Sequence, residues 1–228
     1  MVNSKVAVVF GSTGGIGGQI VAHFRDQRYR LGLFSRSQTD YSDACTLAKS
    51  GDAAEYYEVE NFLVDIETKF KKVDVVIFAI GSVAICMRES YAANVISLHN
   101  VLMLTGLIFP EAKVFVIGSQ RSQIPNYENM TYCVNKAAVD MLVLTMRQQF
   151  PTLKITLIRP GFVDTPLYKE NSKVPYTKDG IPFPVTTPGD IAKLILGFLQ
   201  LSEGAHITEV NIGEPLRERK DLKWRPRV

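Results

Sequence analysis

A tyrosine and a lysine in the second half of the chain have types and spacing that suit proton transfer. Tyr132 and Lys136 lie four positions apart, so in a helix both side chains project from one face, one turn apart. An ammonium beside a phenol favours the phenolate and lowers a pKa that starts near ~10. Ser119, a further hydroxyl, follows an apolar run 13 residues upstream of Tyr132. These residues indicate a proton donor or acceptor, although the same spacing also occurs on solvated helix faces.

A glycine-rich segment near the N-terminus suits phosphate binding. The apolar run at residues 5–10 predicts a strand buried on both faces, and the sequence GSTGGIG follows at residues 11–17. Ile20, Val21 and Phe24 then recur at helical spacing. Glycines allow close backbone approach, and the first N–H groups of a helix attract an anion. Strand, turn and helix together favour a phosphate-binding turn over a purely structural one.

The end of the second predicted strand bears on the choice between two dinucleotides. Residues 29–34 predict this strand, which is followed by Ser35, Arg36 and Ser37. In a dinucleotide fold an acidic residue here accepts from a free ribose 2′-hydroxyl, whereas an arginine accommodates a 2′-phosphate. The chain has Arg36 and no carboxylate at this point, which favours NADP(H) over NAD(H). An Arg36 that is merely exposed is the alternative.

The rest of the chain alternates between predicted strands and helices. Ala44, Leu47 and Ala48 indicate a short helix, residues 55–59 a third strand, and Asn61 the cap of the next helix. Further strands are expected at 73–79, 113–117, 154–158 and 206–212, and further helices at 91–107, 130–149 and 188–201. This alternation predicts an α/β fold of right-handed βαβ units, with a three-layer doubly wound parallel sheet of about seven strands. Residues 1–228 are expected to form one Rossmann-like domain.

Two segments have no clear periodicity. Residues 166–187 contain four prolines and are long for a loop, so we expect a substrate loop there. Residues 214–228 form a basic tail. A solvated or subunit-contacting tail is favoured over a nucleic-acid patch, which would need a basic face on the folded body.

Composition excludes several classes of protein. A net charge of +3 is only mildly basic, and no nucleic-acid partner is expected. Cys45, Cys86 and Cys133 form no paired pattern, and the three histidines lack metal-like spacing, so neither a disulfide framework nor a metal site is expected. No apolar run reaches the roughly 18 residues of a membrane span, and no secretory signal is evident. These features predict a cytoplasmic protein without a membrane partner.

Taken together, the motifs resemble the short-chain dehydrogenase/reductase family in its compact single-domain form. The resemblance covers roughly residues 5–213. It is carried, in chain order, by Gly11-x-x-x-Gly15-x-Gly17, Glu58-Val59, Ala79-Ile80-Gly81, Asn94, Ser119, Tyr132-x-x-x-Lys136 and Pro160-Gly161. Each motif is weak singly, but together they stand in the family's order.

The resemblance implies hydride exchange between a nicotinamide and a carbonyl or alcohol carbon. Tyr132 would be the general acid in reduction and the base in oxidation. Lys136 would lower the pKa of Tyr132 and hold the nicotinamide ribose. Ser119 would donate a hydrogen bond to the substrate oxygen, and Asn94 would hold a water of a proton relay from Lys136. Plain structural roles for Ser119 and Asn94 are the alternative.

The resemblance also implies a set of cofactor contacts. The turn would hold the pyrophosphate, Glu58 and Val59 would border the adenine, and residues after the fourth and sixth predicted strands would line the adenosine and the nicotinamide. The implied set is Gly11, Ser12, Thr13, Gly15, Ile16, Gly17, Ser35, Arg36, Ser37, Glu58, Val59, Ala79, Gly81, Asn94, Tyr132, Lys136, Pro160, Gly161, Val163 and Thr165.

The chain departs from the family pattern in four places. Phe78 to Gly81 lacks the usual structural asparagine, and Glu58 replaces the usual aspartate. The glycine turn contains no arginine or lysine, so the case for NADP(H) rests on Arg36. The connection from Gly81 to Asn94 is only 13 residues, shorter than usual. We therefore expect a more open substrate site on that side.

These observations predict an NADP(H)-dependent oxidoreductase of a small-molecule carbonyl or alcohol, with NAD(H) as the alternative cofactor. A dinucleotide-binding sensor or scaffold with little turnover is the alternative function, and dehydration or epimerisation is a third. The intact Ser119, Tyr132 and Lys136 argue against the sensor. No further acid is placed to replace or accompany the serine, which argues against dehydration or epimerisation. A homodimer or homotetramer is expected from the apolar surplus on two helices, which includes Met141, Leu142, Leu144 and Met146. Packing of these residues within one subunit is the alternative.

Overall fold

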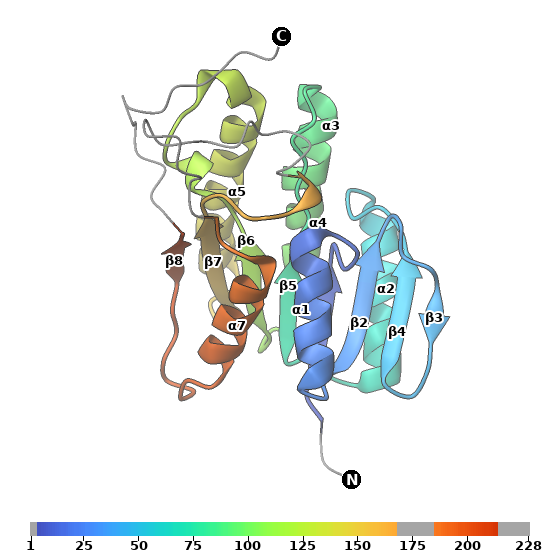
Figure 1. Ribbon diagram of the computed structural model, residues 1–228. Helices are drawn as coiled ribbons and strands as arrows, with labels where there is room; N and C mark the ends of the chain where they lie inside the picture. Colours follow the sequence, from blue (N-terminus) through green and yellow to red (C-terminus); the bar gives the residue numbers. More distant parts are fainter. Residues whose placement is uncertain (1–3, 168–184, 214–228) are drawn as a thin grey trace.

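A computed structural model of the chain describes residues 4–167 and 185–213. An eight-stranded sheet in the order β3-β4-β2-β1-β5-β6-β7-β8 runs through its middle (Figure 1). The strands are β1 Val6–Phe10, β2 Arg30–Ser35, β3 Tyr41–Ser42, β4 Thr46–Ser50, β5 Val75–Phe78, β6 Lys113–Ile117, β7 Lys154–Pro160 and β8 Glu209–Ile212. All neighbours pair in parallel except β3, which lies antiparallel to β4. The expected doubly wound parallel sheet is confirmed, with this short edge strand added.

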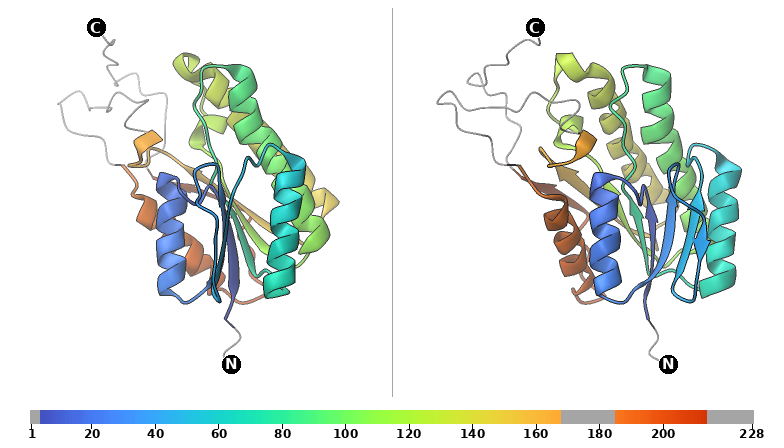
Figure 2. Two further views of the ribbon diagram at one scale, coloured as in Figure 1. Left: turned by 90° about the vertical axis from the view of Figure 1, so that its right-hand side faces the viewer. Right: turned by 45° about the vertical axis from the view of Figure 1, so that its right-hand side comes forward.

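Helices cover both faces of the sheet (Figure 2). They are α1 Gly15–Asp26, α2 Tyr56–Phe70, α3 Met87–Tyr91, the π-helix η1 Ala92–Ile96, α4 Ser97–Ile108, the 3-10 helices η2 Gln120–Ser122 and η3 Tyr127–Asn129, α5 Met130–Gln149 and α7 Pro188–Leu199. One hydrophobic cluster joins α1 and α7 to one face, and a second joins α2, α4 and α5 to the other. Strand β1 supplies both clusters because every one of its side chains is buried.

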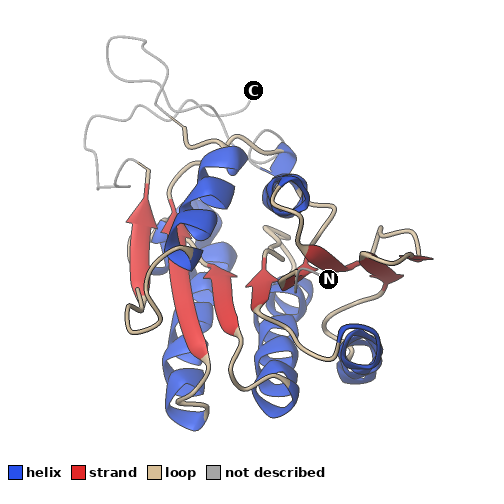
Figure 3. Ribbon diagram, turned by 90° about the horizontal axis from the view of Figure 1, so that it is seen from below, coloured by secondary structure: helices blue, strands red, loops and turns tan. Residues whose placement is uncertain are grey.

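The connections reverse direction at the centre of the sheet. The chain moves from β1 to β2 on one side, whereas β5 pairs with β1 on the other and leads on to β6 and β7. Strand directions change progressively across the sheet, as expected from strand twist (Figure 3). In open α/β sheets a ligand binds at the carboxyl ends of the strands where the order reverses. The turn after β1 and the segment after β5 lie at that point.

Two expected elements on the β4 side are wrong. The short helix at Ala44, Leu47 and Ala48 is instead strand β4, in which Leu47 faces one hydrophobic cluster and Ala48 the other. The strand expected at residues 55–59 is instead the start of α2, and Asn61 lies inside this helix rather than capping it. The reason is packing, since α2 buries apolar residues at helical spacing from Val59 to Phe70.

The polypeptide from Met87 to Ile108 is one continuous helical stretch of three parts, α3, η1 and α4. Among the described residues it alone is long and apolar enough by composition to cross a membrane, a candidate that we did not expect from the sequence. More than half of it is buried, and Leu98, Val101 and Leu102 belong to the core. Packing against the sheet accounts for its apolar character.

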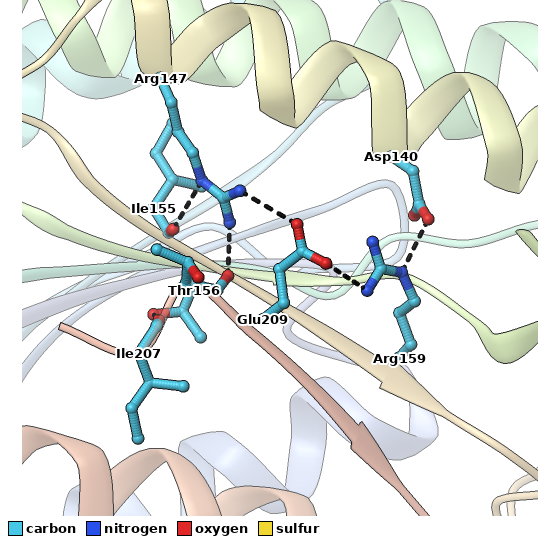
Figure 4. A network of polar contacts seen from close by, with 8 residues as sticks. Asp140, Arg147, Ile155, Thr156, Arg159, Ile207 and Glu209 are labelled. Carbon is cyan, nitrogen blue, oxygen red and sulfur yellow. Dashed lines mark hydrogen bonds and ion pairs between the residues drawn. The ribbon is translucent and has the colours of Figure 1, made fainter. Parts of the chain in front are cut away.

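A polar network fixes the β8 edge of the sheet to α5 (Figure 4). Arg159 on β7 donates from Nε to Asp140 of α5 at 2.7 Å and from Nη1 to Glu209 of β8 at 2.8 Å. Arg147 of α5 also pairs with Glu209 and donates to the carbonyl oxygens of Ile155 and Thr208. Arg159 is buried, and its two carboxylate partners compensate its charge within the fold.

Candidate active site

Three of the predicted catalytic residues meet where β6 ends and α5 begins. Ser119 follows β6, and its hydroxyl lies near enough to that of Tyr132, in the first turn of α5, to favour the phenolate and lower the pKa of the tyrosine. The Nζ atom of Lys136 lies 5.8 Å from the centroid of the Tyr132 ring. It donates to the carbonyl oxygen of Ile117, the last residue of β6, at 3.2 Å. Tyr132 and Lys136 therefore lie one turn apart on α5, as expected. The end of β6 contacts both residues, Lys136 through Ile117 and Tyr132 through the following Ser119.

Burial sets the protonation states of this pair. It lowers the pKa of Lys136 to about 8, an effect that nearby Asp140 partly opposes. Burial also raises the pKa of Tyr132, while the nearby Ser119 hydroxyl and the charge of Arg121 act to lower it. At neutral pH the site therefore combines a protonated phenol with an ammonium group. A protonated phenol held beside the Ser119 hydroxyl is a preplaced proton donor.

Asn94 lies in the π-helix η1, where one wide turn interrupts the surrounding helix. Its Nδ2 donates to the carbonyl oxygens of Ser82 and Ser90 at 2.9 and 2.8 Å, which ties the segment after β5 to the helix. A Cβ added at Gly81 would lie 3.7 Å from Lys136 Nζ and 3.8 Å from Asn94 Oδ1. Gly81 thus leaves open the space between these two atoms, where the predicted relay would run.

The glycine turn has the shape needed to hold a phosphate. Gly11 has φ of +83°, and a Cβ there would lie 2.9 Å from the backbone of Ala79. A Cβ on Gly17 would lie 2.0 Å from the carbonyl oxygen of Gly11. No side chain caps the N-terminus of α1, so the first N–H groups of that helix are available to an anion. The turn therefore fits a dinucleotide pyrophosphate.

Hydroxyl groups cluster where β2 ends. The Thr13 hydroxyl lies 2.8 Å from that of Ser35 and 2.7 Å from that of Ser37, and Ser12 donates to Gln38 at 3.0 Å. Arg36 is exposed beside them and forms no ion pair with any residue in the described ranges. These groups join the glycine turn to the end of β2. They offer hydrogen-bond donors and one positive charge to a phosphate.

The segment after β7 closes the site from the other side. Pro160 ends β7, and the Gly161 N–H donates to Ile212 at 2.9 Å. Val163 and Thr186 form an isolated parallel bridge. A Cβ on Gly15 would lie 2.9 Å from the Thr165 side chain, so Thr165 packs directly over the glycine turn. Of the substrate loop expected at 166–187, residues 168–184 lie outside the described residues, as does the basic tail at 214–228.

Two predicted adenine contacts are misplaced. Glu58 and Val59 were expected to end a strand, but both lie in the first turns of α2. Val59 is fully buried in the core, and the Glu58 carboxylate accepts from the N–H of Asp52 at 2.8 Å. The acidic residue that follows β4 is Asp52, with the small, buried Ala53 after it. Correct placement of β4 would have drawn attention to this pair.

The structure adds residues to the site that sequence reasoning missed. Asn135, fully buried on α5, donates to the Ser90 hydroxyl at 2.8 Å, so it links α5 to the Asn94 cluster. Arg121 follows Ser119 by two residues and donates its N–H to the Ser119 hydroxyl at 3.1 Å. The signal for Arg121 was its closeness in sequence to Ser119. The signal for Asn135 was its place between Tyr132 and Lys136.

The comparisons with known proteins agree with this geometry. The family described as short chain dehydrogenase matches residues 5–175. This chain therefore belongs to the short-chain dehydrogenase/reductase family, whose members carry out NAD(P)-dependent hydride transfer. Among the residues described by the structure, no group of side chains could hold a metal ion.

Individual relatives are distant. The chain is 24% identical over 203 residues to 11-beta-hydroxysteroid dehydrogenase-like 2 of Arabidopsis thaliana, and the match covers 79% of this chain but only 66% of that protein. An alcohol dehydrogenase from the archaeon Thermococcus sibiricus, complexed with 5-hydroxy-NADP, superposes with a TM-score of 0.77 at 21% identity, covering 92% of this chain and 96% of that one. A 7 alpha-hydroxysteroid dehydrogenase complexed with NADH gives 0.77 at 19% identity, with 92% of each chain covered. These structures show the fold.

Proposed function

We propose that the protein is an NADP(H)-dependent oxidoreductase that interconverts a carbonyl compound and its alcohol. The observation that carries this proposal is the pairing of the Ser119 and Tyr132 hydroxyls, with the Lys136 ammonium over the tyrosine ring. When bound, the cofactor supplies or accepts the hydride. The chain's own residues manage the proton and the developing charge on the substrate oxygen.

In the direction of reduction, Ser119 and Tyr132 both donate to the substrate oxygen. As that oxygen gains negative charge, their preplaced donors stabilise it. Tyr132 then gives up its proton, and the Lys136 ammonium stabilises the resulting phenolate. Lys136, with a water held by Asn94 on the other side of the open space at Gly81, would return the proton.

The proposed preference for NADP(H) rests on Arg36 and the hydroxyl cluster of Thr13, Ser35 and Ser37. The fold itself does not select a dinucleotide, because one similar structure holds an NADP analogue and another holds NADH. A guanidinium that forms no ion pair within the described part of the chain, together with three hydroxyls at the end of β2, suits a 2′-phosphate. No carboxylate occupies this position to accept from a free ribose hydroxyl.

A dinucleotide sensor or scaffold is the second candidate. It would need the glycine turn but not the proton donor. The presence of Ser119, Tyr132 and Lys136 together in one site favours catalysis. Measurement of turnover decides between the two.

Tyr132→Phe tests the proposed reaction. Loss of the hydroxyl should lower the rate of carbonyl reduction by about 10²- to 10⁴-fold, the usual contribution of a positioned acid. Binding of NADPH, followed by its fluorescence, should persist because the glycine turn is untouched. Turnover by the variant equal to that of the native protein would refute the role of Tyr132 as the acid.

Arg36→Ala tests the cofactor preference. Removing the guanidinium should raise the KM for NADPH by roughly 10- to 100-fold, as expected for lost charge-assisted hydrogen bonds to a phosphate. The KM for NADH should change little. Arg25→Ala is the matched control for the loss of one exposed positive charge. Arg25 lies in the last turn of α1, at the end of the helix away from the glycine turn. Equal effects on both cofactors would rule out the 2′-phosphate assignment.

A further inference from the structure

Arg121 is held next to the proton donor by contacts on two sides. It lies in the 3-10 helix η2, and its backbone N–H donates to Ser119 Oγ at 3.1 Å. The same short helix packs against α5, which carries Tyr132. The guanidinium charge opposes the effect of burial on the pKa of the Tyr132 phenol. Arg121 therefore borders the place where a substrate carbonyl would lie.

Among the described residues, no acidic side chain pairs with the charge on Arg121. Its side chain is half-buried, and burial lowers the pKa of the guanidinium, which still remains protonated at neutral pH. Across residues 4–167 and 185–213, no carboxylate forms an ion pair with Arg121, and no oxygen accepts a hydrogen bond from its guanidinium. The buried Arg159, by contrast, has two acidic partners. Withdrawing an unpaired cation from water is unfavourable unless a bound anion offsets the cost.

We propose that Arg121 binds a carboxylate group of the substrate, so that the enzyme acts on an oxo acid and the corresponding hydroxy acid. This inference rests on the proposed function and names its substrate class. The planar guanidinium matches a carboxylate through two parallel hydrogen bonds. With the carbonyl oxygen at Ser119 and Tyr132, the carboxylate would lie a few bonds from the reacting carbon.

The arrangement also has an electrostatic consequence for the reaction. A substrate carboxylate brings negative charge close to an oxygen that becomes negative as hydride arrives. Without compensation, this charge would raise the barrier and hinder loss of the proton from Tyr132. The guanidinium of Arg121 offsets it in a half-buried site, where charges are poorly screened. A neutral ketone would leave the Arg121 charge unpaired.

The test compares acids with their methyl esters. NADPH consumption is measured for 2-oxo, 3-oxo and 4-oxo acids, for the ester of each, and for a phosphorylated ketone. The native protein should show kcat/KM about 10- to 100-fold higher for the best acid than for its ester, the range expected for a charge-assisted pair. Arg121→Gln should abolish this preference, and Arg121→Lys should retain part of it. Arg88→Gln, an exposed cation on α3, is the control and should leave the acid-to-ester ratio unchanged.

The outcomes separate this inference from the proposed function. Reduction of esters as efficiently as acids, or of the phosphorylated ketone in preference to both, would overturn the carboxylate assignment while leaving the oxidoreductase intact. If no carbonyl is reduced, the proposed function fails, and calorimetric binding of the oxo acids to the protein with NADP⁺ takes over as the test. Binding that is lost in Arg121→Gln would support the carboxylate site, and absence of binding to the native protein would refute it.

Discussion

At the level of a single side chain, the proposed role of Lys136 conflicts with the stability of the fold. Its ammonium must lie close to Tyr132 to stabilise a phenolate, and that position is buried beneath β6 and α5. Burial lowers the pKa of Lys136 to about 8, so the folded protein holds the charge less readily than the unfolded chain does. Function at this residue therefore lowers the stability of the fold.

Lys136→Met should accordingly stabilise the protein while abolishing turnover. The shift from 10.5 to about 8 corresponds to a cost of about 3 kcal/mol at most, and loss of the bond to Ile117 reduces the gain. Below pH 8 both folded and unfolded lysine are protonated, so the full cost is present. Between pH 8 and 10.5 only the unfolded chain binds the proton, so native stability rises and the advantage of the variant shrinks.

Denaturant unfolding of the native protein and the variant, at pH values below 8 and between 8 and 10.5, measures this effect. Lys193→Met, which removes an exposed lysine from α7, is the control and should show little pH-dependent change. An advantage of Lys136→Met that stays constant across the two ranges would contradict the explanation.

At the scale of elements, the glycine turn between β1 and α1 shows how local geometry restricts residue type. Gly17 faces the carbonyl oxygen of Gly11 so closely that a Cβ would lie 2.0 Å away, whereas a Cβ on the adjacent Gly18 would meet Ser12 at an ordinary 3.7 Å. The two glycines are neighbours in one helix, yet only one of them is required by the fold of the turn.

We therefore expect opposite results from two adjacent substitutions. Gly17→Ala should distort the turn, destabilise the protein by about 1–3 kcal/mol and weaken NADPH binding. Gly18→Ala should preserve binding and stabilise α1 by roughly 0.5–1 kcal/mol, because alanine is the better helix former. Thermal unfolding and NADPH fluorescence titration measure both effects. Equal cofactor affinity in the two variants would show that the turn is not the pyrophosphate site.

Misassigned elements also had consequences for the site. Residues 55–59 were expected to form a strand that ends at the acidic-aliphatic pair Glu58-Val59, but Val59 faces the core from α2. The true third parallel strand, β4, is short and carries polar residues at its end, so its pattern is weak. The error moved the expected adenine contact from the end of β4 to the interior of a helix.

At the scale of the whole molecule, we propose that the outer face of α4 and α5 forms a subunit interface. Met146 and Leu142 pack within the subunit, so half of the expected apolar surplus is explained by the core. Met141 and Leu144 on α5 and Leu107 on α4 remain exposed, at 61%, 41% and 62%. Large exposed apolar side chains on adjacent helices are typical of a surface that another subunit covers.

Met141→Glu combined with Leu144→Glu should convert a dimer or tetramer into smaller species. Two carboxylates placed in an apolar interface would be desolvated without partners, which opposes association. Light scattering after size-exclusion chromatography gives the mass of each species. Val64→Glu, on the exposed side of α2, is the matched control. A native protein that elutes as a monomer near 25 kDa would refute the interface.

The sequence by itself determined the strong local patterns. Continuous apolar runs predicted β1 and β6, the glycine turn predicted the start of α1, and helical spacing predicted α5 with Tyr132 and Lys136 on one face. These features depend on residues close together in the chain. That is why their types alone specify the elements and the family.

Only the tertiary structure decided which distant residues share an environment. Burial, which sets the pKa of Lys136, depends on β6 and α5 packing together. The Asn94 cluster depends on a π-turn and on Asn135 reaching Ser90, and neither has a periodic signature. The lack of an acidic partner for Arg121 among the described residues is visible only in the folded protein, because the absence of a contact is a property of the folded arrangement rather than of any local pattern.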